Sequence, residues 1–86
     1  MKVISKEEMV NSLIEAIQPY KKQLELSDED LETSYNFAMS NLTIDAVNGI
    51  YDSYREFTIY SNNPKEEIDA MLPAFMREIN YMLNGK

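Results

Sequence analysis

The apolar residues at the two ends of this chain recur every three or four positions, and this spacing constrains the fold more than any other feature. Near the N-terminus the series is Met9, Val10, Leu13, Ile14, Ile17, Tyr20 and Leu24. Near the C-terminus it is Ile68, Met71, Leu72, Phe75, Met76, Ile79, Met82 and Leu83. Such spacing places side chains on one face of an α-helix. Both ends of the chain are therefore predicted to be amphipathic helices.

Residues that cap helix N-termini precede each predicted helix. Ser5, Ser27 and Thr43 stand before the first three helical segments, and a hydroxyl at this position accepts a hydrogen bond from the first turn. Asn63 and Pro64 provide the corresponding signal before the last segment, because proline is favoured at the first helical position. The sequence thus predicts four helix starts.

Two prolines interrupt the terminal helices, Pro19 in the first and Pro73 in the last. Inside a helix, a proline removes one backbone hydrogen bond and its ring clashes with the carbonyl group four residues earlier. We therefore expect a kink or a break near Gln18, and likewise a kink or a break at Pro73.

Residues 43–60 admit two interpretations. As a helix, the segment has an apolar stripe formed by Ile44, Val47, Tyr51, Tyr54 and Thr58. As a hairpin, Asn48-Gly49 is the residue pair typical of a type I′ turn. The flanking residues do not alternate between apolar and polar as half-buried strands do. The helix is favoured, and the hairpin stays open as the alternative.

Four amphipathic segments with short connections predict an all-α fold, a compact antiparallel bundle of about four short helices. The minor alternative is an α+β fold with a hairpin at Asn48-Gly49. A chain of 86 residues has room for one hydrophobic core. We therefore expect a single helical domain over residues 1–86.

The negative charge is concentrated in the middle of the chain. The net charge is −7 at pH 7, and residues 27–60 hold seven acidic residues against Arg55 alone. Nucleic acids and anionic membranes attract cations, so we expect neither as a direct partner. A protein with a basic surface is the expected partner, because opposite charges steer association.

The residues that most catalytic and metal sites use are missing from the sequence. It contains no His and no Cys, which removes the commonest general base and the thiolate ligands. Its two glycines, Gly49 and Gly85, form no phosphate-binding loop. The acidic run 28–32 lacks the ligand spacing of a calcium-binding EF-hand. We expect no catalytic residue, no cofactor and no metal, and a protein that is not an enzyme.

The candidate binding surface combines aromatic and acidic residues. Tyrosine is over-represented at protein interfaces because it joins a large apolar ring to a polar tip. The predicted partner-binding residues are Tyr51, Asp52, Tyr54, Arg55, Glu56, Tyr60, Asp28, Glu29, Asp30, Glu32 and Asp45. A second interpretation stays open for both groups. Acids also suit the positive end of a helix dipole, and these tyrosines also suit half-buried packing.

Other methionines and tyrosines are expected to pack in the core. Four methionines lie on the predicted apolar faces, namely Met9, Met71, Met76 and Met82. Three tyrosines lie on or beside the apolar stripes and are expected at the edge of the core, namely Tyr20, Tyr35 and Tyr81.

The function predicted from these features is a small, acidic, non-catalytic protein-binding module that inhibits or neutralises a basic protein, such as one that handles nucleic acid. In its general plan of a small acidic helical bundle, the chain resembles the nuclease-colicin immunity proteins. A chain without His lacks the His-containing central motif of that family. The expected role is that of an inhibitor of the immunity, antitoxin or phage anti-defence kind, whose carboxylates occupy a surface meant for phosphate.

The alternative function is a self-associating structural or assembly protein, in which the wide apolar faces of the first and last helices pair into a homodimer or larger bundle. The N-terminus shows no apolar run of signal-peptide length. The sequence also has no run of about 18 apolar residues to span a bilayer. A cytoplasmic location is expected for either function.

Overall fold

The computed structural model describes residues 4–60 and 64–84 of the chain. These residues form α1 (Lys6–Ile17), the short 3-10 helix η1 (Gln18–Tyr20), α2 (Asp28–Asn41), α3 (Ile44–Tyr60) and α4 (Lys65–Asn84). The described ranges contain no strand. The prediction of an all-α bundle of four short helices is confirmed.

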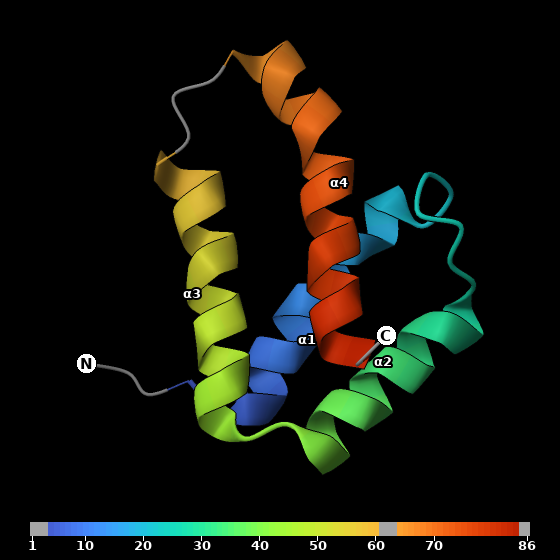
Figure 1. Ribbon diagram of the computed structural model, residues 1–86, viewed down its shortest axis with the longest axis vertical. Helices are drawn as coiled ribbons and strands as arrows, with labels where there is room; N and C mark the ends of the chain where they lie inside the picture. The colour runs from blue at the N-terminus through green and yellow to red at the C-terminus, as the bar shows by residue number, and fades with distance from the viewer. Residues whose placement is uncertain (1–3, 61–63, 85–86) are drawn as a thin grey trace.

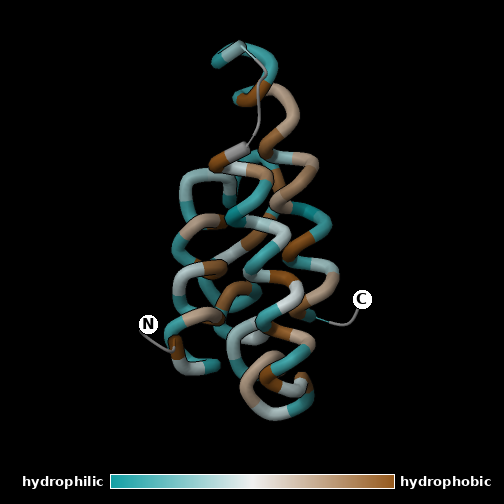
Figure 2. Tube along the Cα trace, turned by 90° about the vertical axis from the view of Figure 1, so that its left-hand side faces the viewer, coloured by the Kyte–Doolittle hydropathy of each residue, from teal (hydrophilic) through white to brown (hydrophobic). Residues whose placement is uncertain are grey.

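The helices are arranged in two layers. Helices α3 and α4 lie side by side and run in opposite directions, and α1 passes behind them (Figure 1). Helix α2 packs against α1 and α4. The molecule measures 36 × 35 × 18 Å along its principal axes, and the short dimension matches two helices stacked roughly 8–10 Å apart. Seen after a turn of 90°, the molecule is narrow, and hydrophobic and hydrophilic residues alternate along its helices (Figure 2).

Hydroxyl side chains cap the first three α-helices, as predicted. Ser5 Oγ accepts a hydrogen bond of 3.1 Å from the backbone N–H of Glu8, and Thr43 Oγ1 accepts one of the same length from the third residue of α3. At α2 the bonds are reciprocal, since Asp30 N donates to Ser27 Oγ and Ser27 N donates to the Asp30 carboxylate at 2.8 Å. This reciprocal pair is a capping box. The predicted cap at Asn63 lies outside the described residues.

The two prolines have different effects. Helix α1 ends immediately before Gln18, and Pro19 lies in η1, so the predicted break is confirmed. Pro73 lies inside α4, which continues through it from Lys65 to Asn84. A proline therefore ends one helix of this protein and not the other.

The chain leaves the η1 region through a left-handed residue. Leu26 N donates to Lys21 O at 2.9 Å, and Glu25 N donates to Lys22 O at 3.2 Å. This pair of bonds forms a Schellman motif. Glu25 has a φ of 58°, a conformation that glycine adopts at lower cost than any residue with a Cβ. The turn also brings Leu24 into the core.

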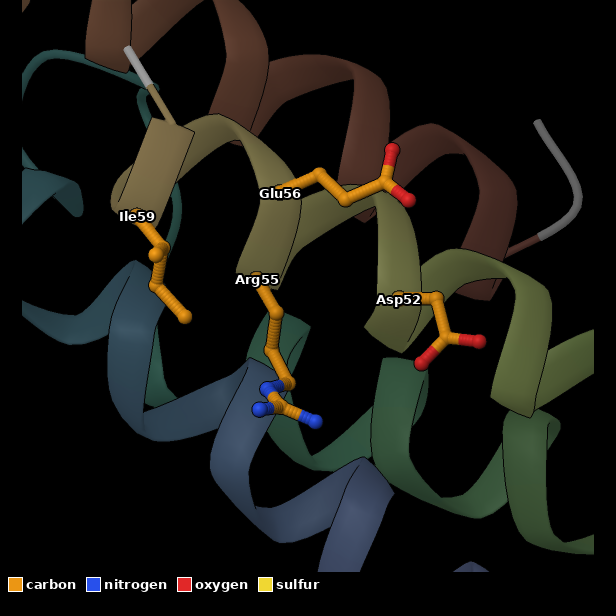
Figure 3. A pocket seen from close by; sticks show the side chains of 4 residues that line it. All are labelled: Asp52, Arg55, Glu56 and Ile59. Carbon is orange, nitrogen blue, oxygen red and sulfur yellow. The ribbon is translucent and has the colours of Figure 1, made fainter.

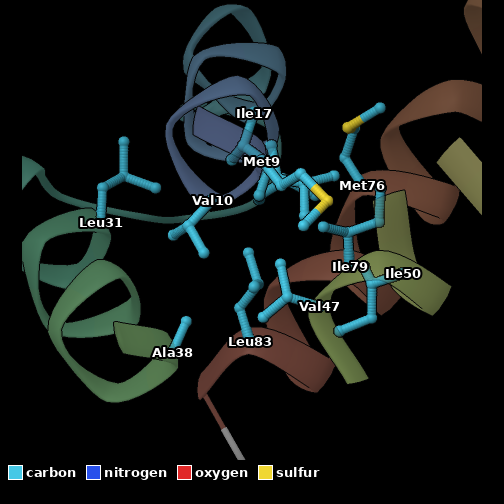
Figure 4. Packing of buried hydrophobic residues seen from close by; sticks show 12 residues of the cluster. Met9, Val10, Ile17, Leu31, Ala38, Val47, Ile50, Met76, Ile79 and Leu83 are labelled. Carbon is cyan, nitrogen blue, oxygen red and sulfur yellow. The ribbon is translucent and has the colours of Figure 1, made fainter. Parts of the chain in front are cut away.

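All four α-helices contribute to one hydrophobic core (Figure 4). Its buried members are Met9, Val10, Leu13, Ile17, Leu24, Leu31, Ala38, Val47, Ile50, Met76, Ile79 and Leu83. Tyr20 and Tyr35 are half-buried against it, as predicted. Ser34 is a fully buried polar residue, and its hydroxyl donates to Asn80 Oδ1 at 2.9 Å. This bond joins α2 to α4 across the core.

Residues 44–60 are helical, so the hairpin predicted as an alternative at Asn48-Gly49 is wrong. The predicted stripe on α3 is also partly wrong. Ile44 and Thr58 are exposed, whereas Ile50 is buried beside Val47. The buried sector of the helix is centred between Val47 and Ile50, and Ile44 lies about 90° from that centre. Thr58 lies on the same side as Val47 but in the last turn of α3.

Three residues of α4 that were predicted to pack in or beside the core are exposed. Met71, Met82 and Tyr81 keep 48%, 39% and 61% of their accessible surface. The fully buried face of α4 contains Met76, Ile79 and Leu83. At 100° per residue, Met71 and Met82 lie roughly 100° around the helix from the centre of that face, and Tyr81 lies on the opposite side. The apolar residues of α4 thus cover more of its circumference than its neighbours bury.

Candidate protein-binding surface

Three predicted site residues form a row along the exposed side of α3. Asp45, Asp52 and Glu56 are all exposed. Their spacing places them within about 40° of one another around the helix and over a length of about 16 Å. We call this row the acidic ridge. The fold therefore places three carboxylates of the predicted site along one exposed helix face.

Exposed isoleucines lie near both ends of the acidic ridge. Ile44 is 51% exposed and Ile59 is 58% exposed. Ile59 lines a shallow hollow of about 280 Å³ together with Asp52, Arg55 and Glu56 (Figure 3). The sequence analysis placed Ile44 in the apolar stripe and did not name Ile59. The signal for Ile59 was its spacing, because it follows Asp52 by seven residues and therefore shares its side of the helix.

Arg55, the basic residue of α3, is directed toward an aromatic ring. Its guanidinium carbon lies 5.9 Å from the centroid of the Tyr51 ring, which is within the range of a cation–π interaction. The neighbouring Asp52 carboxylate accepts a hydrogen bond of 3.3 Å from the neutral amide of Asn48. Because the Asn48 amide is neutral, this hydrogen bond does not neutralise the negative charge of the Asp52 carboxylate.

The tyrosines of the predicted surface pack partly inward. Tyr51 and Tyr54 are half-buried against the core, and the side chain of Tyr60 lies outside the described residues. Burial raises the pKa of Tyr20, and the nearby charges of Asp69 and Tyr54 raise it further. The phenol of Tyr20 is thus close to groups from both α3 and α4. Tyr54 belongs to this packing as well as to the predicted surface.

The acidic run at the start of α2 lies on another side of the molecule. Asp28, Glu29, Asp30 and Glu32 are exposed, at the edge of the fold opposite α3 (Figure 1). Asp30 completes the capping box, and Asp28 forms an ion pair with Lys21. The structure therefore separates the predicted site into two acidic surfaces, and two of the α2 acids have structural partners.

The described residues show no arrangement typical of a metal site or a membrane helix. Over residues 4–60 and 64–84, no three acidic side chains gather as metal ligands would. In the same ranges, no helix combines the length and the apolar character needed to cross a bilayer.

Comparisons of the chain with protein-family models, with curated proteins and with solved structures found no match. The functional argument therefore depends on the surface of the molecule itself.

Proposed function

We propose that this protein is a non-catalytic binding module that inhibits or neutralises a basic protein, in the manner of an immunity protein, an antitoxin or a phage anti-defence protein. The observation that carries the proposal is the acidic ridge. Asp45, Asp52 and Glu56 line one exposed helix face. The proposed location of this activity is the cytoplasm.

The physical basis of the proposal is electrostatic complementarity. A row of carboxylates on a rigid helix attracts a cationic surface and raises the rate of encounter. If that surface normally contacts phosphate groups, the carboxylates of the ridge compete with the phosphates for the same cations. Such an inhibitor needs no catalytic group, because its effect comes from occupying the surface.

The test is a capture experiment with a charge-neutralised ridge. The variant carries Asp45→Asn, Asp52→Asn and Glu56→Gln, which change charge with little change in size. Tagged protein is incubated with lysate of the source cell and washed at increasing salt, and the retained proteins are identified by mass spectrometry. The native protein should retain a basic protein that salt releases, because exposed charges are screened within about 10 Å at 0.1 M salt. The ridge variant should lose it.

A matched control removes the same charge from other surfaces. The control carries Glu7→Gln, Glu8→Gln and Glu15→Gln, all at exposed positions of α1. We expect it to retain the basic protein as the native chain does. Equal retention by the ridge variant and the control would reject the ridge as the binding surface.

Self-association is the second candidate function, and the exposed apolar side chains favour it. These are Ile44, Ile59, Met71, Tyr81 and Met82. The apolar face of α1 is buried within the monomer, so α4 and the ends of α3 supply the available apolar surface. Sedimentation equilibrium at low and high salt distinguishes the two functions. A dimer that persists at high salt would favour the structural role.

A further inference from the structure

One side of the α3–α4 pair is open to solvent. Helix α1 packs against both helices from behind (Figure 1). By their positions around each helix, the exposed residues next to Phe57 and Phe75 and away from the buried sectors are Ala46, Gly49 and Ser53 of α3 and Met71, Ala74, Glu78 and Met82 of α4. We call this set the α3–α4 face.

Two aromatic rings stack beside the α3–α4 face, near the C-terminal end of α3. Phe57 of α3 stacks on Phe75 of α4, with ring centroids 4.4 Å apart and planes inclined by 12°, and both residues are only half-buried. Met71 and Phe75 are separated by four residues, so both lie on the side of α4 that meets α3. The stack and the exposed methionines therefore form one apolar strip.

Small residues line the α3 side of this strip. A Cβ atom placed on Gly49 would meet no atom within 4 Å, so the space above the helix is open there. Ala46 and Ser53 also carry short side chains. Helices pack at interaxial distances of roughly 8–10 Å, and small side chains allow the shorter distances. The α3 side of the face can accordingly admit the backbone of another helix.

Negative charges border the apolar strip. Glu56 lies at the α3 edge of the face, and Glu78 of the face and Glu67 lie on the α4 side, all three exposed. The arginines of the two helices are directed elsewhere, because Arg55 lies over Tyr51 and Arg77 Nη2 contacts Gln23 O at 3.4 Å. A second copy of this chain, with its net charge of −7, would bring like charges together. The border instead matches a cationic occupant.

We propose that the α3–α4 face binds an amphipathic, basic α-helix of the partner. The apolar side of that helix packs on Met71, Met82 and the Phe57–Phe75 stack, and its Lys and Arg residues reach the bordering glutamates. The inference rests on the proposed function, since it takes the target to be a basic protein, and it adds which part of the target is bound. The distance from Ala46 to Phe57, about 16 Å, accommodates about three turns of such a helix.

The two neighbouring surfaces then have different roles. The acidic ridge steers the partner and changes mainly the association rate, whereas the apolar strip holds the docked helix and changes mainly the dissociation rate. Glu56 belongs to the acidic ridge and also lies at the α3 edge of the α3–α4 face.

The probe for this proposal is a synthetic helical peptide of about 18 residues, made of Leu and Lys with Leu at helical spacing. A scrambled peptide of the same composition, which cannot form an apolar face, is the matched control. Both are titrated into the isotope-labelled protein, and amide chemical shifts are recorded. We expect the amphipathic peptide to shift Ala46, Gly49, Ser53, Ala74 and Met82 to saturation, and the scrambled peptide to leave them unchanged.

Two variants test the apolar contact directly. Met82→Glu places a carboxylate on the strip, and we expect the dissociation constant of the peptide to rise about tenfold or more, as for loss of an interface anchor. Ala74→Glu provides a second disruption of the same face, in case circular dichroism shows that Met82→Glu disturbs the fold. Glu15→Gln, at an exposed position of α1, should leave the dissociation constant unchanged.

Several results would overturn the proposal. Shifts confined to the acidic ridge, or equal binding by the scrambled peptide, would show attraction by charge alone. Shifts of the same residues that depend on protein concentration without peptide would identify a second copy as the occupant. Failure here is distinguishable from failure of the proposed function. A basic protein captured from lysate by the ridge, with no peptide binding at the α3–α4 face, rejects only the helix-docking inference. Peptide binding without any captured basic protein rejects only the proposed target.

Discussion

Replacing Gly49 by alanine should stabilise this protein, because Gly49 lies in a helix and its surroundings leave room for a Cβ atom. The residue lies in the interior of α3 on its exposed side, and an added Cβ would meet no atom within 4 Å. Glycine in a helix interior is less favourable than alanine by about 0.8–1.0 kcal/mol. With neither a clash nor new burial, we expect the free energy of unfolding to rise by about 1 kcal/mol. For a domain of this size that corresponds to about 4–8 °C in Tm.

Urea unfolding followed by circular dichroism at 222 nm measures this change. Gly49→Ser is the matched control, because the helix propensity of serine lies between those of glycine and alanine. Stability should therefore increase in the order Gly, Ser, Ala. A loss of stability in both variants would contradict the helix, since it would mean that residues 48 and 49 form a turn in which only glycine fits without strain.

Three further substitutions test other features of the fold by urea unfolding. Glu25→Gly should stabilise the protein by about 1 kcal/mol, because it relieves the left-handed strain at residue 25, and Glu25→Ala should give no such gain. Ser34→Ala should cost about 1–3 kcal/mol because it leaves the Asn80 amide without its buried partner; an unchanged midpoint would mean that water replaces the hydroxyl. The raised pKa of Tyr20 means that the unfolded chain loses this proton at lower pH than the folded chain, so stability should fall as the pH rises past the ordinary tyrosine value of 10.0. Tyr20→Phe should reduce that loss, and an identical pH dependence in the variant would refute the assignment to Tyr20.

The helices could be predicted from the sequence because their signals are local. A cap such as Ser27 acts on the N–H groups of the next turn, and apolar spacing is fixed by 3.6 residues per turn. These features do not depend on the rest of the fold. Helix α3 was ambiguous because Asn48-Gly49 suits a turn. The flanking residues do not alternate between apolar and polar, and this observation correctly favoured the helix.

The orientation of each helix could not be predicted in the same way. Apolar residues cover more than half of the circumference of α3 and α4, so the sequence permits several buried sectors. Packing on α1 selects the sector of Val47 and Ile50 and leaves Ile44 outside it. The left-handed Glu25 and the Ser34–Asn80 bond were missed for similar reasons. Glutamate gives no signal for positive φ, and a hydrogen bond between α2 and α4 depends on tertiary contact.

The acidic residues have different structural surroundings, which the composition of the chain does not reveal. Charge counting treats Asp28, Asp30, Asp52 and Glu56 alike, yet their surroundings differ. Asp30 accepts from a backbone N–H of the capping box and Asp28 pairs with a lysine, so the fold itself makes use of both charges. Asp52 and Glu56 lie one turn apart on the same exposed face of α3, where like charges destabilise a helix by about 0.2–0.5 kcal/mol. Under the proposed function, a cationic partner would offset this repulsion, whereas Asp28 and Asp30 already have partners within the chain.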